Sequence, residues 1–236
     1  MTVRQRISSL LFLHVAGAGF TIAETGTVAP TVQTIITRMT QARADNRAHF
    51  RSYRVTRDYR LFGKERQKSK FEATAHVTFV PPDSKTYAIQ RASGLGVGEK
   101  IVRQMLEGEA HIAKNYGSTD ISPVNYDLRL IGEEYVGAQR CYVLELLPRR
   151  KDKNLLHGKI WVDATTYLLH RMEGEPAKAP SWWLRDARIK FVYGDVGGMW
   201  LQTASESTAD VRLLGRYTMV SRDVGYQHHG TSPAAR

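Results

Sequence analysis

The sequence predicts an α+β fold, an open antiparallel β half-barrel of about ten or eleven strands covered by helices. Apolar and polar residues alternate with a period of two over most of the chain, as they do in strands with one buried face. Two stretches have helical spacing instead, and the connections are short, which favours hairpins over parallel crossovers. A sheet this long must curl and cover its apolar face.

Composition agrees with one globular domain. The 236 residues are 42% hydrophobic and 24% charged, which excludes a collagen, a coiled coil and a polytopic membrane protein. The net charge of +11 favours an anionic partner without choosing among membranes, acidic proteins and nucleic acid. The single cysteine, Cys141, excludes an intrachain disulfide and a thiolate metal cage.

The N-terminus has the pattern of a secretory signal peptide. Arg4 and Arg6 precede a mainly apolar stretch over residues 7–20, and Ala23 is the expected cleavage site,. The alternative is an uncleaved anchor or an amphipathic N-terminal helix. No cysteine at the junction could accept a lipid. We therefore expect a signal peptide over 1–23, one domain over 24–226, and a disordered tail over 227–236.

The first helix is predicted over residues 30–47. Val32, Ile35, Ile36 and Met39 have offsets of three, four and seven, which places them on one face. Pro30 suits the first turn of a helix. This face is expected to pack onto the sheet.

An antiparallel meander of three strands is predicted next. Alternation from Tyr53 to Leu61 and from Phe71 to Phe79 gives each strand one apolar face, and residues 85–90 form the third strand,. Helical spacing returns over residues 99–114,. From Tyr126 onward about seven further strands are expected, with turns at 136–138, 148–154, 164–166, 194–198 and 214–216,.

The hairpins in the second half resemble those of a known family. Tyr142–Pro148 is followed by Gly158–Asp163, with its Trp-Val-Asp ending, and by Tyr167–Gly174. With the order of elements, this resembles the outer-membrane lipoprotein-sorting family, the LolA and LolB-like periplasmic carriers of lipoproteins and lipids. The resemblance implies a hollow lined by apolar side chains and lidded by helices, in which acyl chains bind.

This sequence departs from the pattern of that family at two points. LolB-like members carry a lipid on an N-terminal cysteine, and the absence of one here favours a carrier that is soluble in the periplasm after signal cleavage. We expect this carrier to be a monomer. The family's lid arginine has no assigned counterpart, although Arg43 and Arg47 are expected to follow the apolar face of the first helix.

Signs of catalysis or cofactor binding are weak. Gly94–Lys100 lacks the Gly-Lys-Ser/Thr of a phosphate loop,, so its glycines are interpreted as a flexible entry to the second helix. The adjacent pair His228-His229 lies in the predicted tail, and metal sites need converging ligands. No nucleophile elbow is present,, and Cys141 is expected to be buried and inert. We expect no catalytic residue, metal or cofactor, and therefore no enzyme.

Two surface segments leave alternatives open. Arg149–Lys153 is expected to be a solvated hairpin tip, the alternative being contact with anionic head groups or an acidic partner,. Trp182 and Trp183 are adjacent, so at least one is a candidate for a lid or cavity mouth unless the loop folds both under the sheet edge. Nucleic acid is not expected as a partner.

These observations predict an exported carrier that binds acyl chains in the half-barrel. Its partners would be lipid or acylated lipoprotein, with an anionic membrane surface or a transfer partner as further candidates. The alternative is a non-enzymatic periplasmic sensor or interaction module that binds an envelope protein. Alternation does not distinguish an open cavity from a filled one. The predicted lining residues are Met39, Tyr53, Val55, Phe71, Val77, Phe79, Met105, Leu128, Leu144, Trp161, Ile189 and Phe191.

Overall fold

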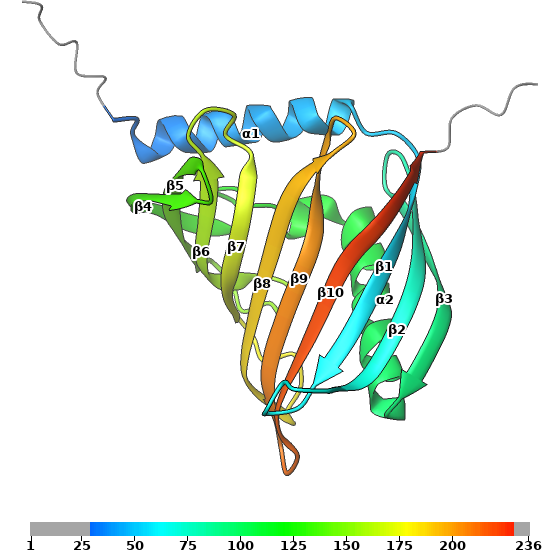
Figure 1. The fold of residues 1–236 in the computed structure, drawn as a ribbon. Helices are drawn as coiled ribbons and strands as arrows, with labels where there is room; N and C mark the ends of the chain where they lie inside the picture. The colour runs from blue at the N-terminus through cyan, green and yellow to red at the C-terminus, as the bar shows by residue number, and fades with distance from the viewer. Residues whose placement is uncertain (1–28, 229–236) are drawn as a thin grey trace, which may run out of the picture.

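A computed structural model describes residues 29–228. One antiparallel sheet contains ten strands in the order β3-β2-β1-β10-β9-β8-β7-β6-β5-β4 (Figure 1). The sheet is not closed, because β3 and β4 are its edges, and the predicted fold class is confirmed. The elements are α1 (Val32–Ala48), β1 (Tyr53–Phe62), β2 (Ser69–Val80), β3 (Ser84–Gly94), α2 (Gly96–Lys114), the short 3-10 helix η1 (Tyr116–Ser118), β4 (Tyr126–Val136), β5 (Gln139–Pro148), β6 (Leu156–Asp163), β7 (Leu169–Pro176), β8 (Leu184–Val196), β9 (Met199–Val211) and β10 (Gly215–His228).

The last strand joins the two parts of the sheet. β10 pairs with β9 on one side and with β1 on the other, so that Tyr59 lies opposite Ser221. The β1–β3 meander therefore extends the sheet formed by β4–β10, as one continuous layer.

Helix α2 covers one face of the sheet as a consequence of topology. It lies between β3 and β4 in the sequence, and these strands are opposite edges. The chain must therefore cross the sheet, and α2 crosses it behind the strands as drawn in Figure 1. We call the covered face the inner face and residues 115–125, which lead from α2 to β4, the connector.

Helix α1 lies along the upper ends of the strands (Figure 1). It begins after Thr31, whose hydroxyl accepts a hydrogen bond of 3.2 Å from the amide of Thr34, a regular N-cap. Ile35, Ile36 and Met39 are buried, as their spacing predicts. Among residues 29–228, no helix is long and apolar enough to span a membrane.

One glycine in the first turn of α2 has a packing role that the sequence does not reveal. The helix begins at Gly96, and Gly98 is buried in its first turn. A Cβ on Gly98 would lie 2.2 Å from Cγ of Phe71, so any side chain there would push α2 off β2. Gly98 is therefore tightly packed and is not part of a flexible entry, whereas an ideal Cβ on Gly96 would meet nothing within 4 Å.

Buried apolar side chains form two main cores on the inner face. The α2 core combines β1, β2 and β9 with Val102 and Leu106 of α2. The α1 core combines β4–β7 with Ile35 and Met39 of α1. Several predictions concern residues outside the described range. These are the signal peptide with its cleavage site at Ala23, nearly all of the tail, and His229.

Candidate functional site

The predicted lining residues are divided between the two cores. Six belong to or pack against the α2 core, five belong to or pack against the α1 core, and Trp161 belongs to neither. Met105, Leu128, Ile189 and Phe191 are partly exposed, whereas the others are buried. The α2 group is Tyr53, Val55, Phe71, Val77, Phe79 and Met105, and the α1 group is Met39, Leu128, Leu144, Ile189 and Phe191.

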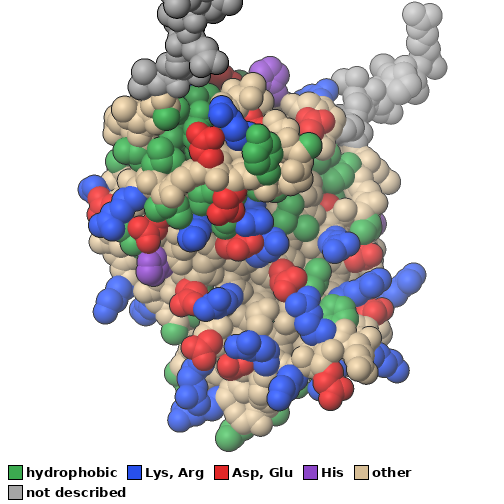
Figure 2. Space-filling view, turned by 60° about the vertical axis from the view of Figure 1, so that its left-hand side comes forward, with side chains coloured by type: hydrophobic (Ala, Val, Ile, Leu, Met, Phe, Trp, Pro, Cys, Tyr) green, Lys and Arg blue, Asp and Glu red, His purple; other side chains and the backbone are tan. Residues whose placement is uncertain are grey.

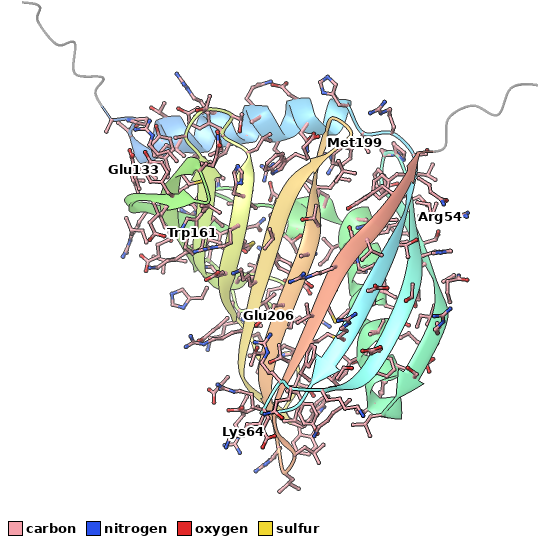
Figure 3. All side chains as sticks on the ribbon, in the orientation of Figure 1. Arg54, Lys64, Glu133, Trp161, Met199 and Glu206 are labelled. Carbon is pink, nitrogen blue, oxygen red and sulfur yellow. The ribbon has the colours of Figure 1, made fainter. Side chains whose placement is uncertain are left out.

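Trp161 lies on the outer face. Residues paired across strands share a face, and Trp161 pairs with Val143 whereas Ile160 pairs with Leu144. The indole Nε1 donates to Glu134 Oε2 at 2.8 Å, and the guanidinium of Arg171 stacks on its ring at 3.6 Å. Figure 3 shows Trp161 at the β4–β7 side of the sheet. Trp161 therefore does not line the inner face as predicted.

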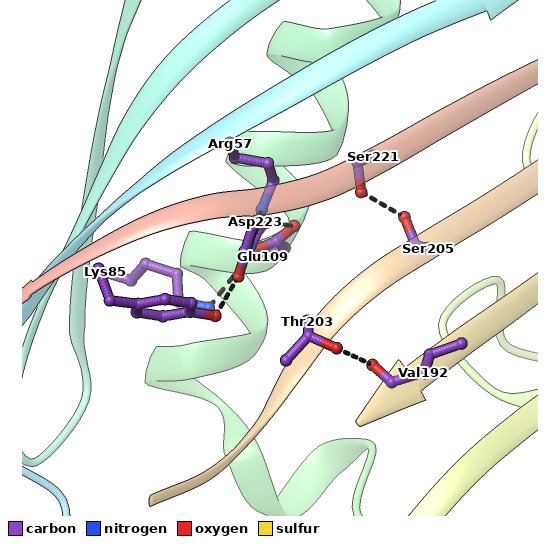
Figure 4. Close-up of polar contacts among 9 residues, drawn as sticks. Arg57, Lys85, Glu109, Val192, Thr203, Ser205, Ser221 and Asp223 are labelled. Atoms are coloured by element: carbon purple, nitrogen blue, oxygen red, sulfur yellow. Dashed lines mark hydrogen bonds and ion pairs between the residues drawn. The ribbon is translucent and has the colours of Figure 1, made fainter. Parts of the chain in front are cut away.

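A buried ionic cluster joins α2 to the inner face (Figure 4). Arg57 of β1, only 5% exposed, donates from Nη1 to Glu109 Oε1 of α2 at 2.7 Å and from Nε to Asp223 of β10. Lys85 of β3 donates to the other oxygen of Glu109 at 3.3 Å. The hydroxyl of Tyr226 donates to Asp223. Glu109 of α2 is thus tied directly to β1 and β3, and through Arg57 to β10.

The charges in this cluster stabilise each other. Desolvation alone would raise the pKa of Glu109, but the positive charges of Arg57 and Lys85 and their hydrogen bonds hold this pKa below its ordinary value. Burial opposes the charge of Arg57, yet the carboxylates of Glu109 and Asp223 raise its pKa above the ordinary value. Burial raises the pKa of the neighbouring Tyr53 to about 12. Glu109 and Arg57 are therefore both charged at neutral pH.

Sequence analysis missed this cluster, although β1 contains a signal for it. Arg57 has the same phase as the inward residues Tyr53, Val55, Tyr59 and Leu61. A charged residue at an inward position implies a buried partner. That partner could not be identified, because Asp223 lies 166 residues further along the chain.

A more polar strip separates the two cores. Ser205 of β9 and Ser221 of β10 are buried and share a hydrogen bond of 2.7 Å (Figure 4). Beside this strip, Ile189, Phe191 and Tyr193 of β8 pack against the α1 core and remain partly exposed. The apolar side chains of β8 next to this strip are thus only partly covered.

The connector is tied to α1 and to the β5–β6 tip. Arg47 stacks on Tyr116 at 4.0 Å and Arg43 on the same ring at 5.8 Å. Arg43 also donates to the carbonyl of Ile121 at 3.3 Å. Both arginines lie within α1 and not beyond its end. The two helical covers of the inner face are therefore linked.

The basic tip is more than a solvated turn. Arg149 donates to Asp127 at 2.6 Å, and Arg150 donates to Oδ1 of Asn125 at 2.5 Å and to the carbonyl of Ser118. Arg150 thereby fastens the connector to β5. Contact of this tip with anionic head groups stays a prediction.

Two grooves lie outside the inner face. One, of about 450 Å³, separates α1 from the β6–β7 turn and is lined by Arg38, Asn46 and Tyr167 among others. The second, of about 520 Å³, lies beside the β5–β6 tip and is lined by Arg150, His157 and Glu175 among others. Neither contains a predicted lining residue. Helix α2, α1 and the connector cover the inner-face residues in this conformation.

Reactive groups are few. Cys141 is fully buried on the outer face, and burial raises its pKa to about 11, which keeps the thiol protonated and unreactive. Within residues 29–228, no group of three or more His, Cys, Asp and Glu side chains could hold a metal ion. The inner face consists mainly of apolar side chains, with the hydroxyls of Ser205 and Ser221 near its centre.

No protein-family model and no curated protein matches the chain. Its structure is similar to an outer membrane lipoprotein-sorting protein domain from Vibrio parahaemolyticus, which is 13% identical, with coverage of 83% of this chain and 93% of that chain and a TM-score of 0.46. A LolA superfamily protein from Nitrosomonas europaea is 12% identical, with 86% and 96% covered and a TM-score of 0.41. A DUF1329 family protein from Desulfovibrio piger is 15% identical, with 86% and 95% covered and a TM-score of 0.42. Structures similar to this chain thus include the group that its sequence resembles.

Proposed function

We propose that this protein is a periplasmic carrier that binds the acyl chains of a lipid or lipoprotein on the inner face of its half-barrel and moves them across the periplasm. The mechanism is physical, since no bond is made or broken. Each buried methylene of the ligand contributes about 0.8 kcal/mol, so a chain of ordinary length can leave a membrane for a protein hollow.

The observation that carries this proposal is how α2 meets the sheet. Its apolar residues Val102 and Leu106 occupy the inner face beside Phe71 and Val77, where an acyl chain would otherwise lie. In this interpretation α2 is the cover that an entering ligand displaces. The ionic cluster at Glu109 returns α2 to the same place after release.

Native mass spectrometry with lipid extraction tests the proposal. Protein purified without detergent is expected to carry a lipid or acylated peptide, or to take one up from vesicles. The inward, partly exposed Phe191 is replaced in Phe191→Ser, and its outward neighbour in Val192→Ser serves as the matched control. Lipid should be lost only from Phe191→Ser. Equal retention by both folded variants would reject the inner face as the site.

A second candidate function is an interaction module for an envelope protein. It is favoured by the free edge of the sheet, where β4 exposes Ile131 and Tyr135, because such an edge can pair with an added strand. A stable protein partner recovered without lipid, with binding lost in Tyr135→Asp, would favour this function over the carrier.

A further inference from the structure

An exposed apolar tip lies at the lower end of the sheet. It consists of Trp182 in the β7–β8 loop and of Leu213 and Leu214 in the β9–β10 hairpin. Their exposed fractions are 79%, 99% and 64%. The hairpin is the part of the fold that projects furthest downward in Figure 1. Exposing neighbouring apolar side chains to water is unfavourable, and contiguous exposed apolar patches are typical of binding surfaces.

The two loops that form the apolar tip are fastened together. The amide of Arg212 donates to the carbonyl of Trp183 at 2.9 Å, and Leu184 pairs with Val211. The guanidinium of Arg212 lies 5.8 Å from the ring centre of Trp182. The tryptophan and the two leucines therefore move as one unit on the end of the sheet.

Positive charge surrounds the apolar tip. The β1–β2, β7–β8 and β9–β10 segments (63–68, 177–186 and 210–216) contain seven Lys and Arg against three Asp and Glu, a net charge of +4. Figure 3 places Lys64 of the first segment beside the hairpin. Figure 2 shows hydrophobic side chains between Lys and Arg at the lower end of the molecule. Apolar residues at the end and cations around them match the layered chemistry of an anionic bilayer surface.

We propose that the apolar tip docks this protein onto lipid bilayers that contain anionic head groups. Leu213 and Leu214 would enter the acyl boundary, and Trp182 would lie at the head-group level, where indoles prefer to be. Lys64, Lys178 and Arg212 would contact the head groups. The inner face and α1 would stay outside the membrane. The inference goes beyond the carrier function and does not depend on it, because docking needs no ligand on the inner face.

Sedimentation with vesicles tests the docking. Wild-type protein is expected to bind vesicles of phosphatidylcholine with phosphatidylglycerol and to bind pure phosphatidylcholine much less. The double variant Leu213→Asp/Leu214→Asp should lose about tenfold or more of this binding. Val80→Asp is the matched control, because Val80 is an exposed apolar residue (46%) at the last position of β2, the end of that strand opposite to the 63–68 segment.

Two further readouts make the result decisive. Tryptophan fluorescence should shift to the blue on anionic vesicles, and the shift should disappear in Trp182→Phe. Arg212→Gln/Lys178→Gln should weaken binding only to anionic vesicles. The proposal is overturned if the wild-type protein does not bind vesicles, if it binds neutral vesicles equally well, or if the Asp double variant binds as well as Val80→Asp. Lipid retention by native mass spectrometry is measured in parallel, so that failure of docking and failure of the carrier function are told apart.

Discussion

Arg57 on β1 and Glu109 on α2 face each other across the inner face, with 2.7 Å between Nη1 and Oε1. They are 52 residues apart in the sequence. The pair therefore fixes where α2 sits on a sheet whose apolar surface alone would allow the helix to slide, since apolar contacts are not directional.

Glu109→Gln should destabilise the protein by about 1–3 kcal/mol. The substitution leaves the buried Arg57 with Asp223 as its only carboxylate in the described cluster. It also removes the negative charge that pairs with Lys85. Urea unfolding measures the loss. Glu99→Gln breaks only an exposed pair with Arg103 on the same helix and should cost less than about 0.5 kcal/mol. Equal losses in the two variants would contradict a special role for Glu109.

Stability should fall in acid through the same group. The folded-state pKa of Glu109 is lowered from 4.5, so its stabilisation is complete above that value and is lost as the pH falls through the lowered pKa. The difference in unfolding free energy between wild type and Glu109→Gln should therefore shrink from pH 7 to pH 3. A difference that stays constant over this range would show that the charge of Glu109 does not matter.

Gly98→Ala should lower stability by about 1–3 kcal/mol, because the new Cβ would overlap the ring of Phe71,. Gly108 lies in the same helix with nothing within 4 Å of its ideal Cβ, so Gly108→Ala should stabilise by about 0.5–1 kcal/mol. Adding Phe71→Leu to Gly98→Ala should cost less than the sum of the single effects. Thermal unfolding of the four variants tests this, and additivity would argue against the contact.

Much of the fold was predictable because its signals are local. Alternation and helical spacing predict the strands and both helices, and the short turns predict hairpins. The pairing of β1 with β10 has no local signal. It places Tyr59 opposite Ser221, and neither side chain distinguishes this pairing from that of another two strands.

The inner-face site was predictable in its apolar part only. Alternation of apolar and polar residues along one strand identifies Val55 and Leu144 as inward. The face on which Trp161 lies depends on how its strand pairs with the strand of Val143, and one strand alone does not reveal that pairing. Arg57 has the inward phase, yet its partners come from β10 and α2. Residues whose role depends on non-local pairing are thus the ones that a single sequence conceals.

Trp161→Phe should lower stability by about 1–2 kcal/mol and leave lipid retention unchanged. The loss follows from the hydrogen bond to Glu134 and the stacking of Arg171,. Retention should not change, because this ring lies on the outer face. Urea unfolding and native mass spectrometry measure the two properties. Loss of lipid from folded Trp161→Phe protein would place the ligand on the opposite face from the one proposed.

Arg150→Met should loosen the connector without unfolding the sheet. Arg150 donates hydrogen bonds to the buried Asn125 and to the carbonyl of Ser118. Without it, these acceptors bind water or stay unpaired, which costs about 1–2 kcal/mol of local stability. A free energy of 1.4 kcal/mol is a factor of ten in an equilibrium constant, so amides of residues 115–125 should exchange roughly tenfold faster.

Arg149→Met is the matched control for this change. Arg149 is the preceding residue in the same basic tip, but its partner Asp127 and its own side chain are both exposed, so the pair is worth about 0–1 kcal/mol and does not reach the connector. If the connector amides exchange hydrogen at the same rate in both variants, the tip is only a solvated turn. If Arg150→Met alone speeds exchange and also speeds lipid uptake, the connector is part of the cover that α2 provides, because the same bonds that fasten it restrain α2.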